Sequence, residues 1–110
     1  MDNPADTVVL LFTNAPDEAV AERIAQAVVQ AKLAACVNVG AAMRSVYRWE
    51  GEVESASEIP MWIKTTASRQ DELMRAIAAL HPYDVPEMLV LPINQGLPAY
   101  LDWVRQETRR

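Results

Sequence analysis

The amino-acid sequence predicts an α+β domain built around a long central β-hairpin. Three observations predict it: short apolar runs typical of strands, two stretches whose apolar residues recur at helical spacing, and a Glu50-Gly51 pair between two strand-like segments. A chain of 110 residues suits one domain. Residues 1–110 are therefore expected to form a single domain, with a flexible N-terminus at residues 1–6.

The first part of the chain is expected to contain one strand and one helix. Residues 7–12 form a continuous apolar run with polar flanks, which is typical of a strand buried on both faces. Pro16 is followed by two acids, a pattern that favours the first turn of a helix over about residues 16–32. The apolar residues at helical spacing, which should face the core, are Val20, Ile24, Ala27, Val28 and Ala31.

The central hairpin is expected to consist of two long strands joined by a turn at residues 50–51. The first strand should cover residues 36–49 with a bend or bulge near Gly40, and the second should cover residues 53–65. Pro60 lacks the N–H that a ladder bond needs. We therefore expect Pro60 where the strand runs past its neighbour or bulges.

The last part of the chain adds a helix, an edge strand and a final helix. The first of these should begin at Ser68, with Asp71 in a variant of the capping box, and end before Pro82. Its expected buried residues are Leu73, Met74, Ile77 and Leu80. Residues 88–93 form an apolar strand that Pro92 places at a sheet edge, and residues 98–108 form a helix whose apolar residues are Tyr100, Leu101, Trp103 and Val104. The order β-α-β-β-α-β-α is the ferredoxin-like split βαβ pattern (βαββαβ) with an added C-terminal helix.

The length of the hairpin predicts an oligomer. Each arm of about 13 residues spans ~40 Å at ~3.3 Å per residue, whereas a domain of this size is roughly 35 Å across. The tip, which carries Val46, Tyr47, Trp49 and Val53, should overhang the domain and need a neighbour, most simply a second copy of the chain. In the alternative, the hairpin bends back at Gly40 and covers its own core.

Charge and composition exclude several classes of protein. The net charge is -5 with dispersed acids, which argues against a nucleic-acid or anionic-membrane partner. No apolar run approaches the ~20 residues of a membrane helix. The single cysteine, Cys36, excludes an internal disulfide, and the acidic polar start is unlike a signal peptide. A cytoplasmic location is therefore expected.

The segment His81–Glu87 holds the only histidine and is stiffened by two prolines. Together His81, Asp84 and Glu87 offer the nitrogen and carboxylate donors that Cu(II) accepts. The alternative is a tight helix-to-strand connection whose polar groups only cap and solvate the chain.

Four ordered segments resemble the CutA divalent-cation-tolerance family over about residues 7–104. They are Lys32–Asn38, Tyr47–Gly51, Glu58 with Lys64-Thr65, and His81–Glu87. The resemblance implies a ferredoxin-like fold, assembly as a homotrimer through the hairpins, and a link to tolerance of copper and other divalent metals. The family's outline is also similar to that of PII signalling proteins.

Two positions depart from the pattern that the resemblance implies. Phe12, or one of its neighbours Leu11 and Thr13, stands where some members of the family have a cysteine linked to copper, and none of the three is a cysteine. Leu80 stands where some members have a second histidine. Both departures argue against a copper site of that type in this chain.

The expected site residues fall into three groups. His81, Glu87, Asp84 and Cys36 are the expected metal ligands, with Glu54 or Glu58 supplied by a neighbouring subunit. The pocket is expected to use Lys64, Glu58 and Tyr83, and the interface Tyr47 and Trp49. Cys36 is alternatively a buried small hydrophobe, and Lys64 alternatively extends along the sheet rim into solvent.

The sequence thus predicts a non-catalytic homotrimer that binds copper or another divalent cation, which is not required for folding. Nucleic acid and membranes are not expected partners. The alternative is a PII-like sensor that binds a small molecule in clefts between subunits. An enzyme that uses His81 with Lys64, Tyr83 and Glu87 is disfavoured, because the sequence contains no nucleophile motif.

Overall fold

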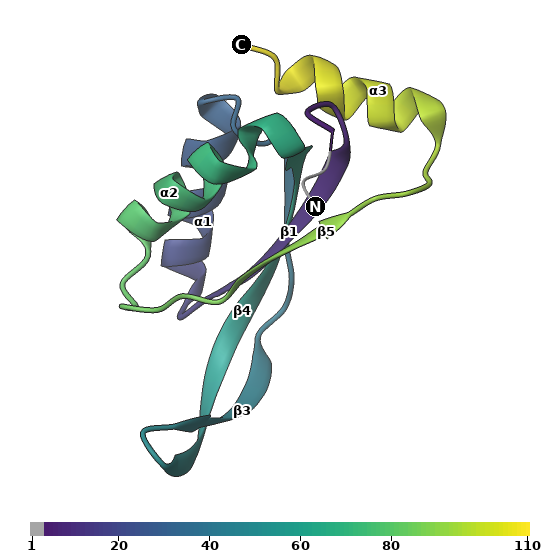
Figure 1. Cartoon of the computed structure of the whole chain (residues 1–110). Helices are drawn as coiled ribbons and strands as arrows, with labels where there is room; N and C mark the ends of the chain where they lie inside the picture. Colours follow the sequence, from purple (N-terminus) through teal and green to yellow (C-terminus); the bar gives the residue numbers. More distant parts are fainter. Residues whose placement is uncertain (1–3) are drawn as a thin grey trace.

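The structure is a computed structural model that describes residues 4–110 (Figure 1). The strands are β1 (Val8–Ala15), β2 (Cys36–Val39), β3 (Met43–Trp49), β4 (Glu52–Thr66) and β5 (Met88–Pro92). The helices are α1 (Glu18–Gln30), α2 (Gln70–Leu80) and α3 (Pro98–Glu107), and a 3₁₀ turn at Ala67–Arg69 precedes α2. Strands β2 and β3 both pair with β4 and together form the first arm of the hairpin. Counted as one arm, they confirm the α+β class and the βαββαβ pattern with an added C-terminal helix.

The sheet is antiparallel, and its strands run in the order β2-β4-β1-β5, with β3 pairing to β4 beyond the end of β2. Helices α1 and α2 cover one face of this sheet (Figure 1). Alternate residues of the central strands point into the layer between sheet and helices, since side chains alternate along a strand. The largest fully buried side chains of this core are Leu11, Ile24, Met61, Ile63, Leu73 and Ile77.

The first arm of the hairpin is interrupted at residues 40–42, which confirms the bend expected near Gly40. Pro60 lies opposite this interruption, and its carbonyl accepts a hydrogen bond of 2.9 Å from the Gly40 N–H. A Cβ atom on Gly40 would lie 2.9 Å from Pro60 Cγ and 2.9 Å from Trp62 Cζ3. Glycine is therefore needed at position 40, and Pro60 lies where the neighbouring arm of the hairpin is interrupted, so that arm needs no hydrogen-bond donor from the proline.

The hairpin projects beyond the helices in Figure 1 instead of folding back over the core. Its two-residue turn has positive φ at both positions, 50° at Glu50 and 83° at Gly51, as a type I′ turn requires. Val46 and Val53 near the tip are 63% and 66% exposed. The overhang predicted from strand lengths is present, in a molecule that measures 43 × 30 × 23 Å.

The expected end of the first strand was wrong, whereas the first helix lies where it was expected. β1 continues to Ala15, three residues past the expected end, because Thr13, Asn14 and Ala15 all pair with β4. Helix α1 begins at Glu18 and ends at Gln30, inside the range expected. Asp17 is its N-cap, with a carboxylate that accepts a 2.9 Å hydrogen bond from the Val20 N–H.

The expected capping box at the second helix was also wrong. The N-cap of α2 is Arg69 and no side chain caps it, whereas the Ser68 hydroxyl lies 3.1 Å from the Thr66 hydroxyl. The end of α2 before Pro82 is confirmed, with His81 in an extended conformation. β5 pairs only with β1, so Pro92 does lie on an edge strand.

Of the four apolar residues expected on the last helix, only Val104 is fully buried, and Tyr100 and Trp103 are each 40% exposed. At the other end of the chain, residues 4–6 are hydrogen-bonded: the Ala5 carbonyl accepts from the Ser68 N–H at 2.9 Å, and the Asp6 carbonyl from Arg105 Nε at 2.8 Å. Residues 1–3 of the expected flexible N-terminus lie outside the described residues.

Candidate functional site

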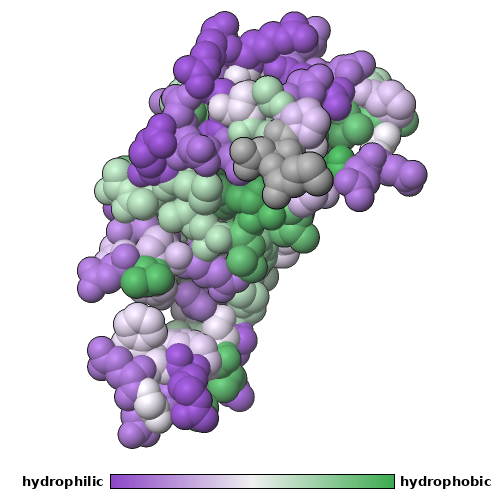
Figure 2. Space-filling view, in the orientation of Figure 1, coloured by the Kyte–Doolittle hydropathy of each residue, from purple (hydrophilic) through white to green (hydrophobic). Residues whose placement is uncertain are grey.

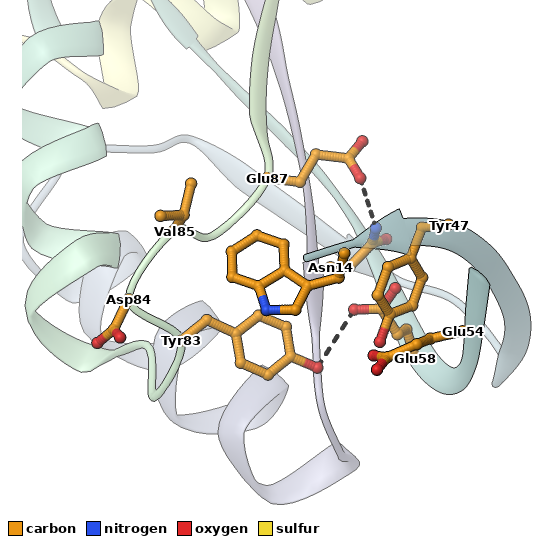
Figure 3. A pocket seen from close by; sticks show the side chains of 9 residues that line it. Asn14, Tyr47, Glu54, Glu58, Tyr83, Asp84, Val85 and Glu87 are labelled. Atoms are coloured by element: carbon orange, nitrogen blue, oxygen red, sulfur yellow. Dashed lines mark hydrogen bonds between the residues drawn. The ribbon is translucent and has the colours of Figure 1, made fainter. Parts of the chain in front are cut away.

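The His81–Glu87 loop faces the hairpin across a cleft of about 370 Å³. β1, the hairpin strands β3 and β4, and the loop itself each contribute to its walls (Figure 3). The lining residues are Asn14, Tyr47, Trp49, Glu54, Glu58, Tyr83, Asp84, Val85 and Glu87.

His81 ties the loop to the end of β1. Its side chain is 7% exposed, and Nε2 lies 2.7 Å from the Asn14 carbonyl oxygen, which can only accept. Nε2 therefore carries the proton, and Nδ1 is left as an acceptor for the Tyr83 N–H at 3.2 Å. Both ring nitrogens are thus engaged within the chain, and the imidazole is positioned to hold the loop.

Glu87 is fixed by the strand that lies next to it. The Thr13 hydroxyl donates to the Glu87 carbonyl at 2.6 Å, and Asn14 Nδ2 donates to Glu87 Oε1 at 3.0 Å (Figure 3). Our sequence reasoning missed both partners. The only available signal was a polar pair directly after the apolar run, outside the strand expected at residues 7–12.

Glu58 reaches the same cleft from β4 and is 9% exposed. The Tyr83 hydroxyl donates to Glu58 Oε2 at 3.4 Å. Burial, and then the negative charge of Glu58, raise the pKa of Tyr83 above its ordinary value. The tyrosine thus stays protonated and remains a donor to the carboxylate.

The cleft is electronegative. Four carboxylates line it, those of Glu54, Glu58, Asp84 and Glu87, and its lining among residues 4–110 includes no lysine, arginine or histidine. Carboxylates gathered in a partly enclosed site favour a cationic ligand, because low-dielectric walls focus the field. This arrangement can attract a cation.

The donors of one chain do not close a metal site by themselves. Within residues 4–110, no three His, Cys, Asp or Glu side chains are grouped closely enough to hold a metal ion. In Figure 3 the Asp84 carboxylate points away from Glu54 and Glu58. The cleft supplies carboxylate oxygens, which suit hard divalent cations better than Cu(I).

Cys36 and Lys64 lie away from the cleft, paired across β2 and β4. Lys64 Nζ is 4.0 Å from Cys36 Sγ and also donates to Asn38 Oδ1. Burial, and then the neighbouring Cys36 thiol, raise the pKa of Tyr100 above its ordinary value. Within one chain, therefore, the structure does not bring either Cys36 or Lys64 to the expected loop site.

Tyr47 and Trp49, expected as interface residues, line the cleft and are 41% and 48% exposed. Glu54 also lines the cleft of its own chain, although it was expected as a contribution from a neighbour. The hairpin therefore forms a wall of the site as well as an extension of the sheet.

The fold and the acidic cleft define a small α+β protein with a site suited to cations, and the sequence places the chain in a family. Residues 9–107 match the family described as CutA1 divalent ion tolerance protein. The chain belongs to this family.

Individual relatives agree with this assignment. The chain is 47% identical over 100 residues to the divalent-cation tolerance protein CutA of Thermus thermophilus, covering 91% of this chain and 96% of that protein. It is 46% identical over 97 residues to protein CutA of Mus musculus, covering 88% of this chain but only 55% of the mouse protein. The crystal structure of CutA from Xylella fastidiosa superposes with a TM-score of 0.92 at 40% identity, covering 94% of this chain and 99% of that one.

Membrane insertion through a helix finds no support in the described part of the chain. None of the helices within residues 4–110 has the length and apolar character needed to cross a bilayer.

Proposed function

We propose that this chain is a non-catalytic divalent-cation tolerance protein that works in the cytoplasm as a homotrimer and binds divalent cations at the acidic cleft. The observation that carries the proposal is the cleft's lining, in which residues 4–110 place four carboxylates and no cationic side chain. Glu58 and Glu87 are the principal ligands, because Tyr83 and Asn14 hold their carboxylates in place. Water or a neighbouring subunit supplies the remaining donors.

His81 has a structural role in this proposal. Coordination of copper by either nitrogen would break the hydrogen bond to the Asn14 carbonyl or the one from the Tyr83 N–H. The same two bonds argue against His81 as a catalytic base, since neither nitrogen is available to a substrate. Carboxylate ligation by Glu58 and Glu87 needs no such rearrangement.

The open face of the sheet supports self-association. Helices α1 and α2 cover the opposite face, and hydrophobic surface is visible on the part of the sheet that they leave open (Figure 2). The ring of Trp62 packs edge-on against Phe12 at a centroid distance of 5.6 Å and is still 37% exposed. Beside them, Leu89 and Leu91 of β5 are 54% and 48% exposed. Large apolar side chains gathered on one face favour burial against another copy of the chain.

A second candidate function is a PII-like sensor that binds a small organic molecule. The cleft volume of about 370 Å³ lies within the range of small-molecule pockets, and aromatic rings of Tyr47, Trp49 and Tyr83 line it. The acidic lining would select a cationic molecule over a nucleotide. A thermal-shift screen of small molecules against metal-stripped protein tests this alternative.

The cation proposal is tested by calorimetric titration of metal-stripped protein with Zn²⁺ and Cu²⁺. We expect saturable binding with a whole-number ratio per trimer, weakened at least tenfold in Glu58→Gln and Glu87→Gln. Glu107→Gln is the matched control, because Glu107 is an exposed acid at the end of α3, outside the cleft. Equal affinities in all four proteins would refute the assignment of the cleft as the cation site.

The trimer is tested separately by light scattering at micromolar concentration. The wild-type protein should have three times the mass of one chain. Leu89→Asp places a charge on the open face and should lower the mass toward that of a monomer. A monomeric wild-type protein would refute the trimer without bearing on the cation site.

A further inference from the structure

A second cavity, of about 350 Å³, lies at the other end of the sheet from the acidic cleft. The end of β4, the 3₁₀ turn before α2 and the last turn of α3 meet there, near residues 5 and 6 (Figure 1). Four arginines line it: Arg69, Arg105, Arg109 and Arg110. Nothing in the proposed cation function uses this cavity.

Arg69 is the buried member of this group. It is 7% exposed, and its Nη1 pairs with Glu72 at 3.2 Å. Its Nε is buried and has no hydrogen-bond partner among residues 4–110. A buried charged donor without an acceptor is costly, so this guanidinium favours an anionic acceptor in the cavity that it lines.

Among residues 4–110, arginine side chains outnumber the acidic side chains at this cavity. Asp6 is the one acidic side chain in the lining that residues 4–110 provide. Glu72 pairs with Arg69 and Arg110, and Asp102 pairs with Arg105 at 3.0 Å. Among residues 4–110, four guanidinium groups thus lie near three acidic side chains, in a chain whose net charge is -5. Arg109 is exposed, and within residues 4–110 no side chain pairs with its guanidinium.

Neutral donors complete the site. Thr66 and Ser68 both line the cavity, and their hydroxyl oxygens lie 3.1 Å apart. One hydroxyl donates its proton to the other, and the accepting hydroxyl keeps its own proton to donate to a ligand. Helix α2 begins directly after Ser68 and Arg69 with no side chain at its N-cap. Its N-terminal dipole adds partial positive charge at the same place.

We propose that this arginine cavity binds a phosphate group, as inorganic phosphate or as the phosphate of a small molecule. Guanidinium groups pair with phosphate oxygens through charge-assisted hydrogen bonds, and a hydroxyl donor suits a further oxygen. The cavity is larger than a single phosphate needs, so it also has room for a second phosphate or a small organic group.

The test is calorimetric titration of the full chain with sodium phosphate and with sodium pyrophosphate, each at ionic strength held constant with sodium chloride. We expect saturable binding of one anion per chain. Tighter binding of pyrophosphate would identify an occupant with two phosphates, and equal affinity would identify a single phosphate group. Binding of neither anion above the chloride background would overturn the proposal.

Two variants locate the site without relying on buried Arg69, whose replacement risks the fold. Arg109→Gln should weaken phosphate binding about tenfold, and Ser68→Ala should weaken it several-fold, because both residues line the cavity and are exposed. Arg75→Gln, an exposed arginine on α2 outside the cavity, should leave the affinity unchanged. Equal loss in Arg75→Gln and Arg109→Gln would show diffuse charge attraction and overturn the proposal.

Discussion

Replacement of His81 tests whether this histidine has a structural role or binds a metal ion. The imidazole bridges the loop and β1, through Nε2 to the Asn14 carbonyl at 2.7 Å and through Nδ1 to the Tyr83 N–H at 3.2 Å. His81→Ala removes both bonds and most of a side chain that is 7% exposed. We expect this variant to be less stable than the wild type while its affinity for divalent cations changes little.

The size of the loss follows from the surroundings of each bond. The Asn14 carbonyl loses its hydrogen-bond donor in a residue that is 5% exposed, which costs about 1–3 kcal/mol. Tyr83 is exposed, so water replaces the lost partner of its N–H and the cost is about 0.5–1 kcal/mol. The total for His81→Ala is therefore about 1.5–4 kcal/mol.

Two further variants divide this total between the bonds. In His81→Asn, Oδ1 takes the place of Nδ1 and retains the Tyr83 bond only. In His81→Gln, the amide nitrogen reaches the position of Nε2 and retains the Asn14 bond. We expect stability to fall in the order wild type, Gln, Asn, Ala, because the bond to the buried carbonyl is the costlier one to lose.

Urea unfolding at matched protein concentration measures these differences, since an oligomer's stability depends on concentration. With a slope of about 2 kcal/mol per molar urea, the midpoint of His81→Ala should fall by roughly 1–2 M. The reasoning is refuted if His81→Ala keeps its stability within about 0.5 kcal/mol but loses its affinity for Cu²⁺. That result would make the imidazole a ligand.

Three other predictions concern stability. Gly40→Ala should cost about 1–3 kcal/mol in thermal unfolding, because its Cβ would lie 2.9 Å from Pro60; an unchanged melting temperature would contradict the close approach. Asp17→Ala should cost about 1 kcal/mol through loss of the cap on Val20, whereas Asp17→Asn should retain most of it. The raised pKa of Tyr83 means that the unfolded chain releases this proton first. Stability should therefore be complete below about pH 10 and decline as the pH rises further, and Tyr83→Phe should reduce that decline in urea unfolding from pH 9 to 11.

Local sequence rules placed the hairpin well, because backbone chemistry fixes its features. A proline without a donor, a glycine and a two-residue turn each constrain the chain wherever it folds. Pro60, Gly40 and Gly51 accordingly lie where their backbone properties are needed. The boundary error at Ala15 arose because tertiary pairing overrode the local signals: β4 is long enough to extend β1 through Thr13 and Asn14.

The site was harder to predict, because its geometry depends on contacts between distant segments. The loop was recognised from its residues, but the bond from Asn14 to Glu87 spans 73 positions and the bond from His81 to the Asn14 carbonyl spans 67. No local pattern shows that the histidine is occupied and the carboxylates are accessible. A ligand-type residue in a rigid loop can serve either the loop or the ligand, and only the hydrogen-bond partners of each nitrogen and oxygen distinguish the two.

The acidic cleft and the arginine cavity should bind their ligands independently. β4 links them, with Glu58 in the cleft and Thr66 in the cavity. Eight residues at ~3.3 Å each separate them by ~26 Å along the strand, about three times the Debye length of ~8 Å at physiological salt. We therefore expect Arg109→Gln to leave the Zn²⁺ affinity unchanged and Glu87→Gln to leave the phosphate affinity unchanged, each within about twofold. A larger cross-effect in calorimetry would mean that the two sites are coupled through a change in the fold, because direct electrostatics cannot carry it over that distance.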